Sequence, residues 1–253
     1  MYTKYTGIIL KKHPLGEADE LLTIYTKEAG KLRVRAVASR KIRSRLAGNL
    51  QSLNEIDFEV AGNRSRRAGS GHIPVLISAR ARTLNNYVRE DLKKFAYALL
   101  GAETLYRLTP DRQENIGAYE AVADFLHLLG ESREEKTMAR ALQMNLLRLF
   151  GFTMPLSACA NCLRPFSPAE KSVYFVSDKG GMFCEGCQGQ GQSQVRADGD
   201  VLQELRLLND GGRPQTLHWA AEQVIDGFLH YVLEREIKSR NFLHTLTGDD
   251  SDE

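Results

Sequence analysis

The sequence predicts an α+β multidomain protein, in which a small five-stranded β-barrel is followed by an α-helical domain with an inserted ribbon built on four cysteines. Three observations predict this architecture. Between residues 6 and 81, short segments of alternating apolar and polar residues are separated by Gly-containing turns. From residue 87 onward, apolar residues recur at helical spacing. Two Cys-x-x-Cys pairs then interrupt the helical part.

Five strands are predicted, at residues 7–12, 20–26, 31–38, 54–60 and 75–81. The fourth alternates most clearly, with Ile56, Phe58 and Val60 on one face, because successive side chains of a strand point to opposite faces. Their number and length favour a five-stranded barrel of the oligonucleotide-binding (OB) kind over residues 1–82.

The third predicted strand has one apolar and one cationic face. Its apolar positions alternate with Lys and Arg, and four more cations follow within seven residues of the next loop. Such a surface suits a polyanion, because dense positive charge attracts phosphates. The alternative is a solvated charged strand and loop. The candidate contact residues, including those of neighbouring segments, are Lys31, Arg33, Arg35, Arg40, Lys41, Arg43, Arg45, Arg64, Arg66, Arg67, Arg80 and Arg82.

The charge distribution indicates which part of the chain meets that partner. The formal net charge is +2, but residues 1–90 carry 17 Lys+Arg and 8 Asp+Glu, whereas residues 91–253 carry 17 and 24. The first part is therefore at +9 and the remainder at −7. A basic domain joined to an acidic one indicates that the N-terminal domain binds the polyanion.

Export and membrane insertion are not expected. No apolar run reaches the roughly 18 residues of a membrane span, and the apolar stretch near the N-terminus is too short for a signal peptide. We therefore expect a cytoplasmic protein, in which cysteines are more often metal ligands than disulfides.

After the barrel, the sequence predicts five helices. The first spans 87–107, the second follows 111–114 and ends at about 129, and the third follows 132–135 and ends at 151. The last two span 200–208 and 216–239. The segments 111–114 and 132–135 resemble capping boxes and predict where the second and third helices start. The expected domains are the barrel at 1–82, a first helical part at 83–157, a zinc-ribbon insertion at 158–195, a second helical part at 196–246 and a disordered acidic tail at 247–253.

The cysteines are the most specific chemical signal. Cys159 and Cys162 form one pair, Cys184 and Cys187 the other, and 21 residues separate the pairs. Two residues between thiolates let both sulfurs reach one tetrahedral ion, and four thiolates fill the coordination sphere of Zn²⁺. The spacing therefore predicts one structural zinc ion that holds a core-poor insertion together. Disulfides, a redox pair and unliganded thiols are the alternatives.

Signatures of common enzyme classes do not occur in the sequence. It has no phosphate-binding loop, dinucleotide fingerprint, nucleophile elbow or paired zinc-binding histidines, and no carboxylate cluster at usable spacing. We therefore expect no catalytic residues and no small-molecule substrate, and a nuclease or other metal enzyme is the least supported alternative.

With these features in order, the chain resembles the RecO family of bacterial DNA repair and recombination mediators over nearly its whole length. The segments that carry the resemblance are Gly-Ile-Ile-Leu-Lys at 7–11, Gly-Glu-Ala-Asp at 16–19, Leu-Leu-Thr at 21–23, Gly-Lys at 30–31, Arg-Ser-Arg-Leu-Ala-Gly at 43–48 and Leu-Arg-Leu-Phe-Gly-Phe at 147–152. The chain departs from the family pattern at 38–42, which reads Ala-Ser-Arg-Lys-Ile, and in the basic, Gly-rich segment 63–71.

The resemblance implies an N-terminal OB-fold that binds single- and double-stranded DNA and anneals complementary strands without catalysis. It also implies partnership with RecR, contact with single-strand-binding protein, and help in loading RecA onto coated DNA, in the bacterial cytoplasm and nucleoid. On this interpretation the basic residues contact DNA. Tyr25 is either a stacking platform for bases or a packed core residue.

Two other functions stay open at this point. One is a zinc-ribbon factor that binds RNA or acts in transcription. The other is a protein-interaction scaffold whose basic face binds an acidic peptide.

Overall fold

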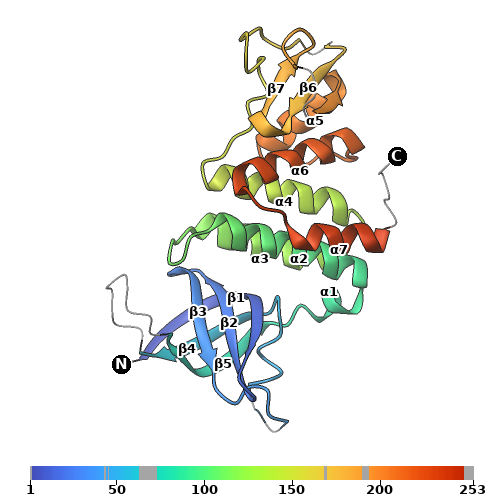
Figure 1. Ribbon diagram of the computed structural model, residues 1–253. Helices are drawn as coiled ribbons and strands as arrows, with labels where there is room; N and C mark the ends of the chain where they lie inside the picture. The colour runs from blue at the N-terminus through green and yellow to red at the C-terminus, as the bar shows by residue number, and fades with distance from the viewer. Residues whose placement is uncertain are drawn as a thin grey trace. The chain divides into compact units, whose positions relative to one another are not determined.

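The structure, a computed structural model, describes residues 2–42, 44, 46–62, 73–167, 170–189 and 194–247. The chain forms two compact units, Met1–Ser132 and Arg133–Glu253. The first unit holds a β-barrel and the helices that follow it, and the second holds the remaining helices and a three-stranded sheet (Figure 1). The finer division of the chain into five domains remains a prediction, and most of the expected acidic tail lies outside the described residues.

The barrel consists of the strands β1 (Tyr2–Leu15), β2 (Asp19–Thr26), β3 (Gly30–Ala36), β4 (Glu55–Ala61) and β5 (Val75–Thr83). They close in the order β1-β2-β3-β5-β4, and β1 pairs antiparallel with both β2 and β4. β3 and β5 run parallel where Arg35 lies opposite Val75. The closed five-stranded sheet confirms the predicted OB barrel, and each strand overlaps its predicted segment.

Strand β1 is longer than predicted because it pairs with two neighbours in turn. Its first half pairs with β4 and its second half with β2, with a register shift between Ile9 and Lys11. At Gly7, where the two pairings overlap, a Cβ atom would lie 2.6 Å from Cγ2 of Ile24 and 2.8 Å from the carbonyl oxygen of Tyr25. Glycine therefore lets the strands approach closely at this point.

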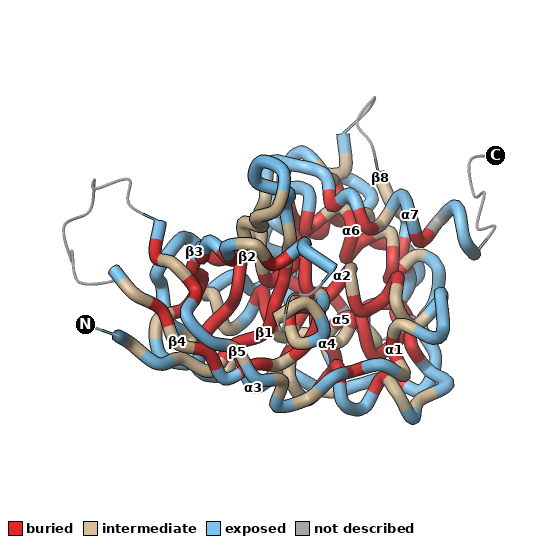
Figure 2. Tube along the Cα trace, turned by 90° about the horizontal axis from the view of Figure 1, so that it is seen from below, coloured by how far each residue is buried: buried red, intermediate tan, exposed pale blue. Residues whose placement is uncertain are grey.

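The barrel core is made by the inward faces of the strands and one residue of the β3–β4 connection. Its buried members are Ile9, Leu22, Ile24, Leu32, Val34, Ala36, Leu50, Ile56, Phe58, Val60 and Leu76. Figure 2 shows buried and exposed positions alternating along the strands. In β3 the buried apolar positions alternate with exposed Arg33 and Arg35, as the sequence predicts.

Lys31 departs from this alternation. Its side chain is only 10% exposed and enters the C-terminal end of helix α2 (Leu92–Leu108), where the ammonium donates to the carbonyl oxygens of Tyr106, at 3.0 Å, and Thr109. The last carbonyls of a helix have no partner within it and carry partial negative charge, so a buried lysine stabilises this helix end. Burial lowers the pKa of the Lys31 ammonium, and Asp111, 3.5 Å away, opposes the shift.

The first predicted helix is wrong as a single element. It is divided into α1 (Asn86–Glu90) and α2, because Asp91 between them is extended and its carboxylate accepts from the N–H groups of Lys93 and Lys94. This N-cap satisfies two amides that the helix leaves free and fixes where α2 begins.

Helix α3 (Ile116–Glu131) begins after Asn115, whose side chain accepts from the N–H of Ala118. The capping box predicted at 111–114 is therefore wrong, because Asp111 faces Lys31 and Arg33 instead. Two tyrosines join α3 and its start to the barrel: Tyr119 donates to Oε1 of Glu55 at 2.6 Å, and Tyr25 donates to the carbonyl of Asn115 at 3.4 Å.

The second unit contains α4 (Glu135–Leu149), α5 (Gly199–Asn209), α6 (Trp219–Leu233) and α7 (Lys238–Thr247). The capping box predicted at 132–135 is wrong, since Ser132 ends α3 and α4 starts at Glu135 without a side-chain cap. The helix predicted at 216–239 is two helices, because Glu234 takes a left-handed conformation with φ 51 that ends α6. In the described part of the chain, no helix combines the length and apolarity that crossing a membrane requires.

A buried ion network joins α4, α6 and α7. The Arg140 guanidinium donates to both oxygens of Asp226, and Nε of Arg240 lies 3.0 Å from Oδ2 of the same carboxylate. Lys136 on α4 pairs with Glu222 on α6 at 2.6 Å. Buried charges require such partners, so the three helices depend on one another for the pairing of their ions.

The ribbon of the second unit is a three-stranded antiparallel sheet in the order β7-β6-β8, made of β6 (Val173–Val176), β7 (Gly181–Cys184) and β8 (Gln194–Ala197). The β6–β7 hairpin carries Cys184 of the second cysteine pair within the predicted ribbon, and β8 adds a third strand. In the turn of this hairpin, Gly180 has φ 59, and a Cβ atom there would lie 2.3 Å from the ring of Tyr231 on α6.

We predict that Lys31→Met destabilises the first unit by about 1–3 kcal/mol, because it leaves the carbonyls of Tyr106 and Thr109 without their buried donor. The matched control is Arg33→Met, which removes an exposed partner of the same Asp111 and should change stability by about 0.5 kcal/mol or less. Chemical denaturation of the two full-length variants measures the difference. Equal stability of both variants would contradict the structural role of Lys31.

Candidate nucleic-acid interface and metal centre

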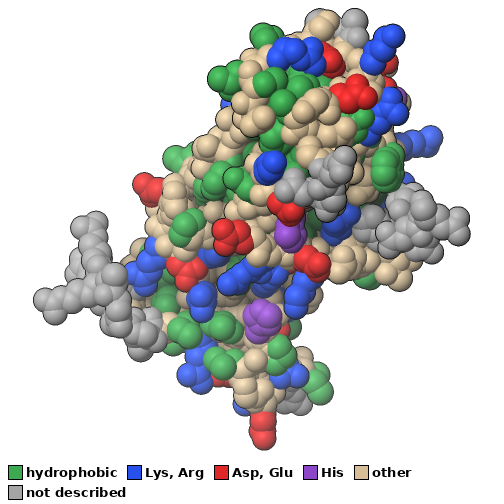
Figure 3. Space-filling model, turned by 45° about the horizontal axis from the view of Figure 1, so that its top comes forward, with side chains coloured by type: hydrophobic (Ala, Val, Ile, Leu, Met, Phe, Trp, Pro, Cys, Tyr) green, Lys and Arg blue, Asp and Glu red, His purple; other side chains and the backbone are tan. Residues whose placement is uncertain are grey.

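The outward face of β3 carries two arginines that water reaches. The side chains of Arg33 and Arg35 are 56% and 49% exposed, and each has a carboxylate partner, Asp111 at 3.1 Å and Asp19 at 2.7 Å. The Arg33–Asp111 pair is exposed on both sides and is worth about 0–1 kcal/mol, so a phosphate can compete with Asp111, whereas the side chain of Asp19 is only 14% exposed. In Figure 3, Lys and Arg side chains lie among apolar ones over the barrel.

The turn after β3 is held in place by the β1–β2 hairpin. Ala38 has φ 52, and its N–H donates to Oδ1 of Asp19 at 2.8 Å. The buried hydroxyl of Ser39 donates to Oε2 of Glu20 at 2.8 Å. The N–H of Arg40 donates to a carbonyl of the β1–β2 turn at 3.0 Å. These hydrogen bonds fix the backbone of the turn from which the exposed side chains of Arg40 and Lys41 project.

Three of the remaining predicted contact residues, Lys31, Arg80 and Arg82, do not join this group. Arg80 and Arg82 lie on β5 beside β4, where Arg82 is 3.7 Å from both Glu55 and Asp57. Lys31 is buried, as described above. Five predicted contacts lie outside the described residues: Arg43, Arg45, Arg64, Arg66 and Arg67.

Tyr25 is a packed core residue and does not offer its ring to a base. Its side chain is 0% exposed. Burial raises the pKa of its hydroxyl to about 12, although the hydrogen bond to Asn115 lowers it. Of the two interpretations of Tyr25, packing is confirmed and the stacking platform is wrong.

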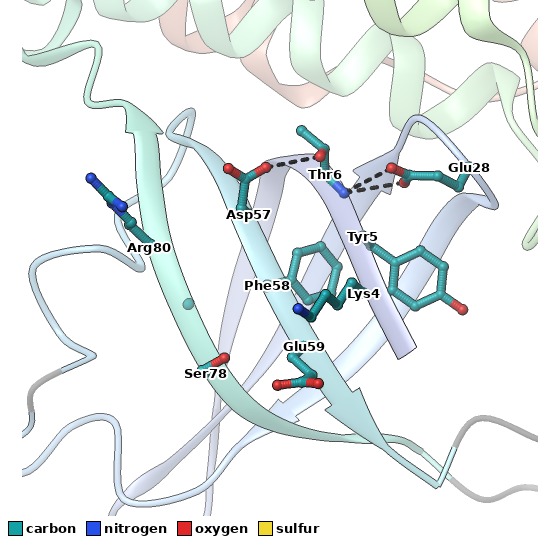
Figure 4. A pocket seen from close by; sticks show the side chains of 10 residues that line it. Lys4, Tyr5, Thr6, Glu28, Asp57, Phe58, Glu59, Ser78 and Arg80 are labelled. Carbon is teal, nitrogen blue, oxygen red and sulfur yellow. Dashed lines mark hydrogen bonds between the residues drawn. The ribbon is translucent and has the colours of Figure 1, made fainter. Parts of the chain in front are cut away.

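A pocket of about 490 Å³ opens on the barrel where β1, β4 and β5 lie side by side (Figure 4). Its lining residues are Lys4, Tyr5, Thr6, Glu28, Asp57, Phe58, Glu59, Ser78, Ala79 and Arg80. Carboxylates outnumber cations in this lining, and Thr6 already donates to Glu28 through its N–H and to Asp57 through its hydroxyl. Because that charge repels phosphate, the cationic face of β3 and its turn is the better candidate interface.

The four cysteines meet in the ribbon. Their sulfur atoms all lie within 4.8 Å of one another, and Cys162 Sγ is 3.7 Å from Cys184 Sγ. Sulfurs of a disulfide are about 2.05 Å apart. Sulfurs around a tetrahedral ion with bonds of 2.3 Å are about 3.8 Å apart. The cluster therefore has the geometry of a site for one metal ion and is compatible with zinc.

Backbone hydrogen bonds build this cluster from two turns. The N–H of Leu163 donates to the carbonyl of Cys159 at 3.0 Å, and the N–H of Cys187 donates to that of Cys184 at 2.9 Å. The N–H of Ala160 donates to Met182 at 2.8 Å, which joins the first turn to β7. Each pair is thus closed by a turn of its own, and the sheet brings the pairs together.

The donor set also has the chemistry that a soft divalent cation requires. Burial raises the pKa of Cys159, but the N–H groups of Cys162, Cys184 and Asn161 lower it by more, to about 6. The pKa of Cys184 is raised to about 11 by burial and by the other thiols. A metal ion binds thiolates, so the N–H groups around Cys159 favour the ligand form.

Two carboxylates shape the cationic face, and no spacing pattern marks them in the sequence. Asp19 links Arg35 to the N–H of Ala38, and Asp111 faces both Lys31 and Arg33 from 78 to 80 residues away in the chain. Asp19 does lie in the segment 16–19 that carries the family resemblance, but its hydrogen bonds depend on the fold.

Comparison with known protein families finds two matching models. The model described as "Recombination protein O N terminal" matches residues 1–70, and "Recombination protein O C terminal" matches residues 89–241. The second match alone covers more than half of the chain.

Proteins called DNA repair protein RecO are similar to the chain over nearly its full length. The protein of Symbiobacterium thermophilum is 30% identical over 249 residues, covering 95% of this chain and 96% of the relative. That of Moorella thermoacetica is 31% identical over 254 residues, covering 97% and 92%. That of Myxococcus xanthus is 27% identical over 243 residues, covering 94% and 95%.

We predict a pH-dependent contribution of Asp19 to stability. The N–H of Ala38, and after it Arg35, hold the pKa of the Asp19 carboxyl below its ordinary value. Because the folded pKa is the lower one, the carboxylate stabilises the fold above the ordinary value of about 3.9, and this is lost as pH falls through the lowered pKa. Asp19→Asn should therefore lower the melting temperature near pH 7, and the difference should shrink toward pH 3.

The control for this measurement is Asp124→Asn on the exposed side of α3. Its melting temperature should equal that of the wild type at both pH values. A deficit of Asp19→Asn that grows as pH falls would contradict the prediction.

Proposed function

Because the chain belongs to the RecO family of DNA repair proteins, we propose that it binds DNA through the cationic face of β3 and the turn after it, and that it anneals complementary strands there. The observation that carries the proposal is the continuity of exposed cations from Arg33 and Arg35 on the strand to Arg40 and Lys41 on the anchored turn. Strand alternation directs the first two outward, and hydrogen bonds fix the backbone of the other two.

Annealing by such a surface needs no catalysis. Two complementary strands repel each other through their phosphates, and cations that neutralise both backbones lower this repulsion. Base pairing then provides the free energy, so neither a nucleotide cofactor nor a catalytic residue takes part in the proposed mechanism.

The predicted contact residues have different weights in this proposal. The exposed turn cations Arg40 and Lys41 meet phosphates directly, since among the described residues Arg40 is held only by backbone carbonyls of the β1–β2 turn and Lys41 acts on Asp19 through its charge alone. Arg33 and Arg35 exchange Asp111 and Asp19 for phosphates. Lys31 acts from inside, by fixing β3 to the end of α2. The arginines at 43, 45, 64, 66 and 67 extend the surface on the basis of sequence alone.

The family also supports a place in recombinational repair. We propose that the chain works with RecR and single-strand-binding protein and helps to load RecA onto coated single strands, in the cytoplasm of a bacterium and at its nucleoid. These partners come from the family resemblance, and the cationic surface is consistent with them because the shared substrate is DNA.

We propose that the metal ion of the four-cysteine site is Zn²⁺ and that its role is structural. Support comes from the donor set, since four thiolates leave a tetrahedral Zn²⁺ no open position for a substrate or water. Cys159, Cys162, Cys184 and Cys187 would hold the ion, which supplies no reaction chemistry and links the two turns of the ribbon.

The DNA-binding proposal predicts a steep salt dependence. If about five phosphates of a single strand are neutralised, the logarithm of the binding constant should fall with log[salt] at a slope of about −3.5. Removing two contacts with Arg40→Ala/Lys41→Ala should weaken binding about tenfold and reduce the slope by about 1.4. Fluorescence anisotropy over a salt series, with a strand-annealing assay in parallel, measures both.

The matched control is Arg80→Ala/Arg82→Ala, which removes two cations from β5, outside the cationic face of β3 and its turn, and should cost much less affinity. A slope near zero would refute the electrostatic mechanism, and an unchanged affinity of the turn variant would show that another surface binds DNA. Strong preference for structured RNA over single-stranded DNA would favour an RNA-binding function.

For the metal site we predict one zinc ion per chain in the wild type and its loss in Cys184→Ser, with destabilisation of the second unit. The control is Met182→Leu, a buried substitution on the same strand that keeps all four ligands. Elemental analysis of the purified proteins and the absorption spectrum of the cobalt-substituted wild type test this. A full metal content in Cys184→Ser would disprove the four-cysteine site.

A further inference from the structure

We propose that Ile42 is an apolar wedge that contacts the bases of the bound strand and unstacks them, so that the turn after β3 touches nucleobases as well as phosphates. The inference rests on the proposed DNA binding and adds to it the chemical group that this turn recognises, the apolar face of a base.

The exposure of Ile42 is the first observation. Its relative accessibility is 105%, the highest among the large apolar side chains that the structure describes. Single exposed apolar residues are ordinary on protein surfaces, and exposure alone indicates no ligand. Ile42 differs in where the fold places it.

The residue stands at the apex of a hydrogen-bonded turn. The N–H of Ser44 donates to the carbonyl of Lys41 at 2.8 Å, and Ile42 follows Lys41 within this turn. The preceding turn is closed by a bond from the N–H of Lys41 to the carbonyl of Ala38 at 3.3 Å. β-Branched apolar residues are disfavoured in turns, so local preference does not account for isoleucine here.

The base of the turn fixes the direction in which its apex points. Asp19 accepts from the N–H of Ala38, Glu20 accepts from the hydroxyl of Ser39, and the β1–β2 turn accepts from the N–H of Arg40. After the apex, Leu46 returns to pack on the barrel core. The hydrogen bonds at the base of the turn keep the side chain of Ile42 from folding back onto the barrel. We infer that it is presented to a partner.

The charges beside Ile42 decide what kind of partner fits. Arg40 and Lys41 precede it directly and are both exposed, and no acidic residue occurs between Glu28 and Glu55. A hydrophobic groove on another protein would have to tolerate this dense positive charge. A nucleic acid suits both the cations and the apolar side chain, because its phosphates bind Arg40 and Lys41 while its bases contact Ile42.

A branched aliphatic side chain is also suited to this task. Proteins that distort DNA insert residues such as Ile, Leu or Met between base steps, and the partial unstacking costs free energy at each step. That cost is smaller in a single strand, so the wedge would act most on unpaired or transiently open DNA. Bases that are held unstacked are free to meet their complements during annealing.

The test uses the full-length protein and a single strand that contains 2-aminopurine, whose fluorescence rises when it unstacks. Saturating wild-type protein should raise the signal, and Ile42→Ala should reduce that rise to less than about half while the dissociation constant changes less than about threefold, since phosphate contacts carry the affinity. Ile42→Phe should keep or exceed the wild-type rise. Ile77→Ala, which removes another exposed isoleucine from β5, should match the wild type.

The outcomes separate the wedge from the DNA-binding proposal. If the wild type fails to bind DNA at low salt, the proposed function is wrong. If it binds and Ile42→Ala gives the full 2-aminopurine signal, DNA binding stands and the wedge is refuted. A loss of binding to a partner protein, with the 2-aminopurine signal intact, would equally overturn the wedge and assign Ile42 to a protein contact.

Discussion

The position of β3 depends on the ammonium group of Lys31, which leaves the solvent side of the strand and enters the C-terminal end of α2. There it meets the carbonyls of Tyr106 and Thr109, and the connector after α2 pairs with the strand through the bond from the N–H of Arg112 to the carbonyl of Lys31. Unpaired carbonyls at a helix end cost free energy, and so does a buried cation without a partner. Here the ammonium and the carbonyls form hydrogen bonds with each other, so both costs are reduced. Barrel and helices of the first unit are therefore parts of one structure.

The same arrangement explains why each arginine on the cationic face of β3 is paired with a carboxylate. Asp111 follows the helix end that receives Lys31, and from there it also reaches Arg33, while Asp19 fixes Arg35 and the turn after β3 together. Each carboxylate pairs with one arginine of the face, which lowers the repulsion between the like charges of Arg33 and Arg35. In the proposed function, the exposed side chains of Arg33 and Arg35 exchange these carboxylates for phosphates.

The second unit is stabilised differently from the first. Its ribbon has three strands of four residues, which bury too little to be stable alone, and its four sulfurs are gathered by turns that close on backbone hydrogen bonds. The helices below depend on the buried pairing of Arg140 with Asp226. The ion network between the helices, and the metal ion that we propose for the ribbon, replace part of what a larger apolar core would supply.

The sequence by itself determined the periodic and the local features of this protein. Strand alternation predicted the barrel and the outward direction of Arg33 and Arg35, and the spacing of the cysteines predicted their convergence, because both follow from backbone geometry over a few residues. The tertiary structure alone decided which cation is buried and which acid caps a helix. Lys31 and Arg33 share one face of the pattern, yet only Lys31 faces the end of α2. Asp111 looks like a helix cap in sequence, yet it is drawn to cations almost 80 residues away. Contacts between distant segments set these roles, and no local period encodes them.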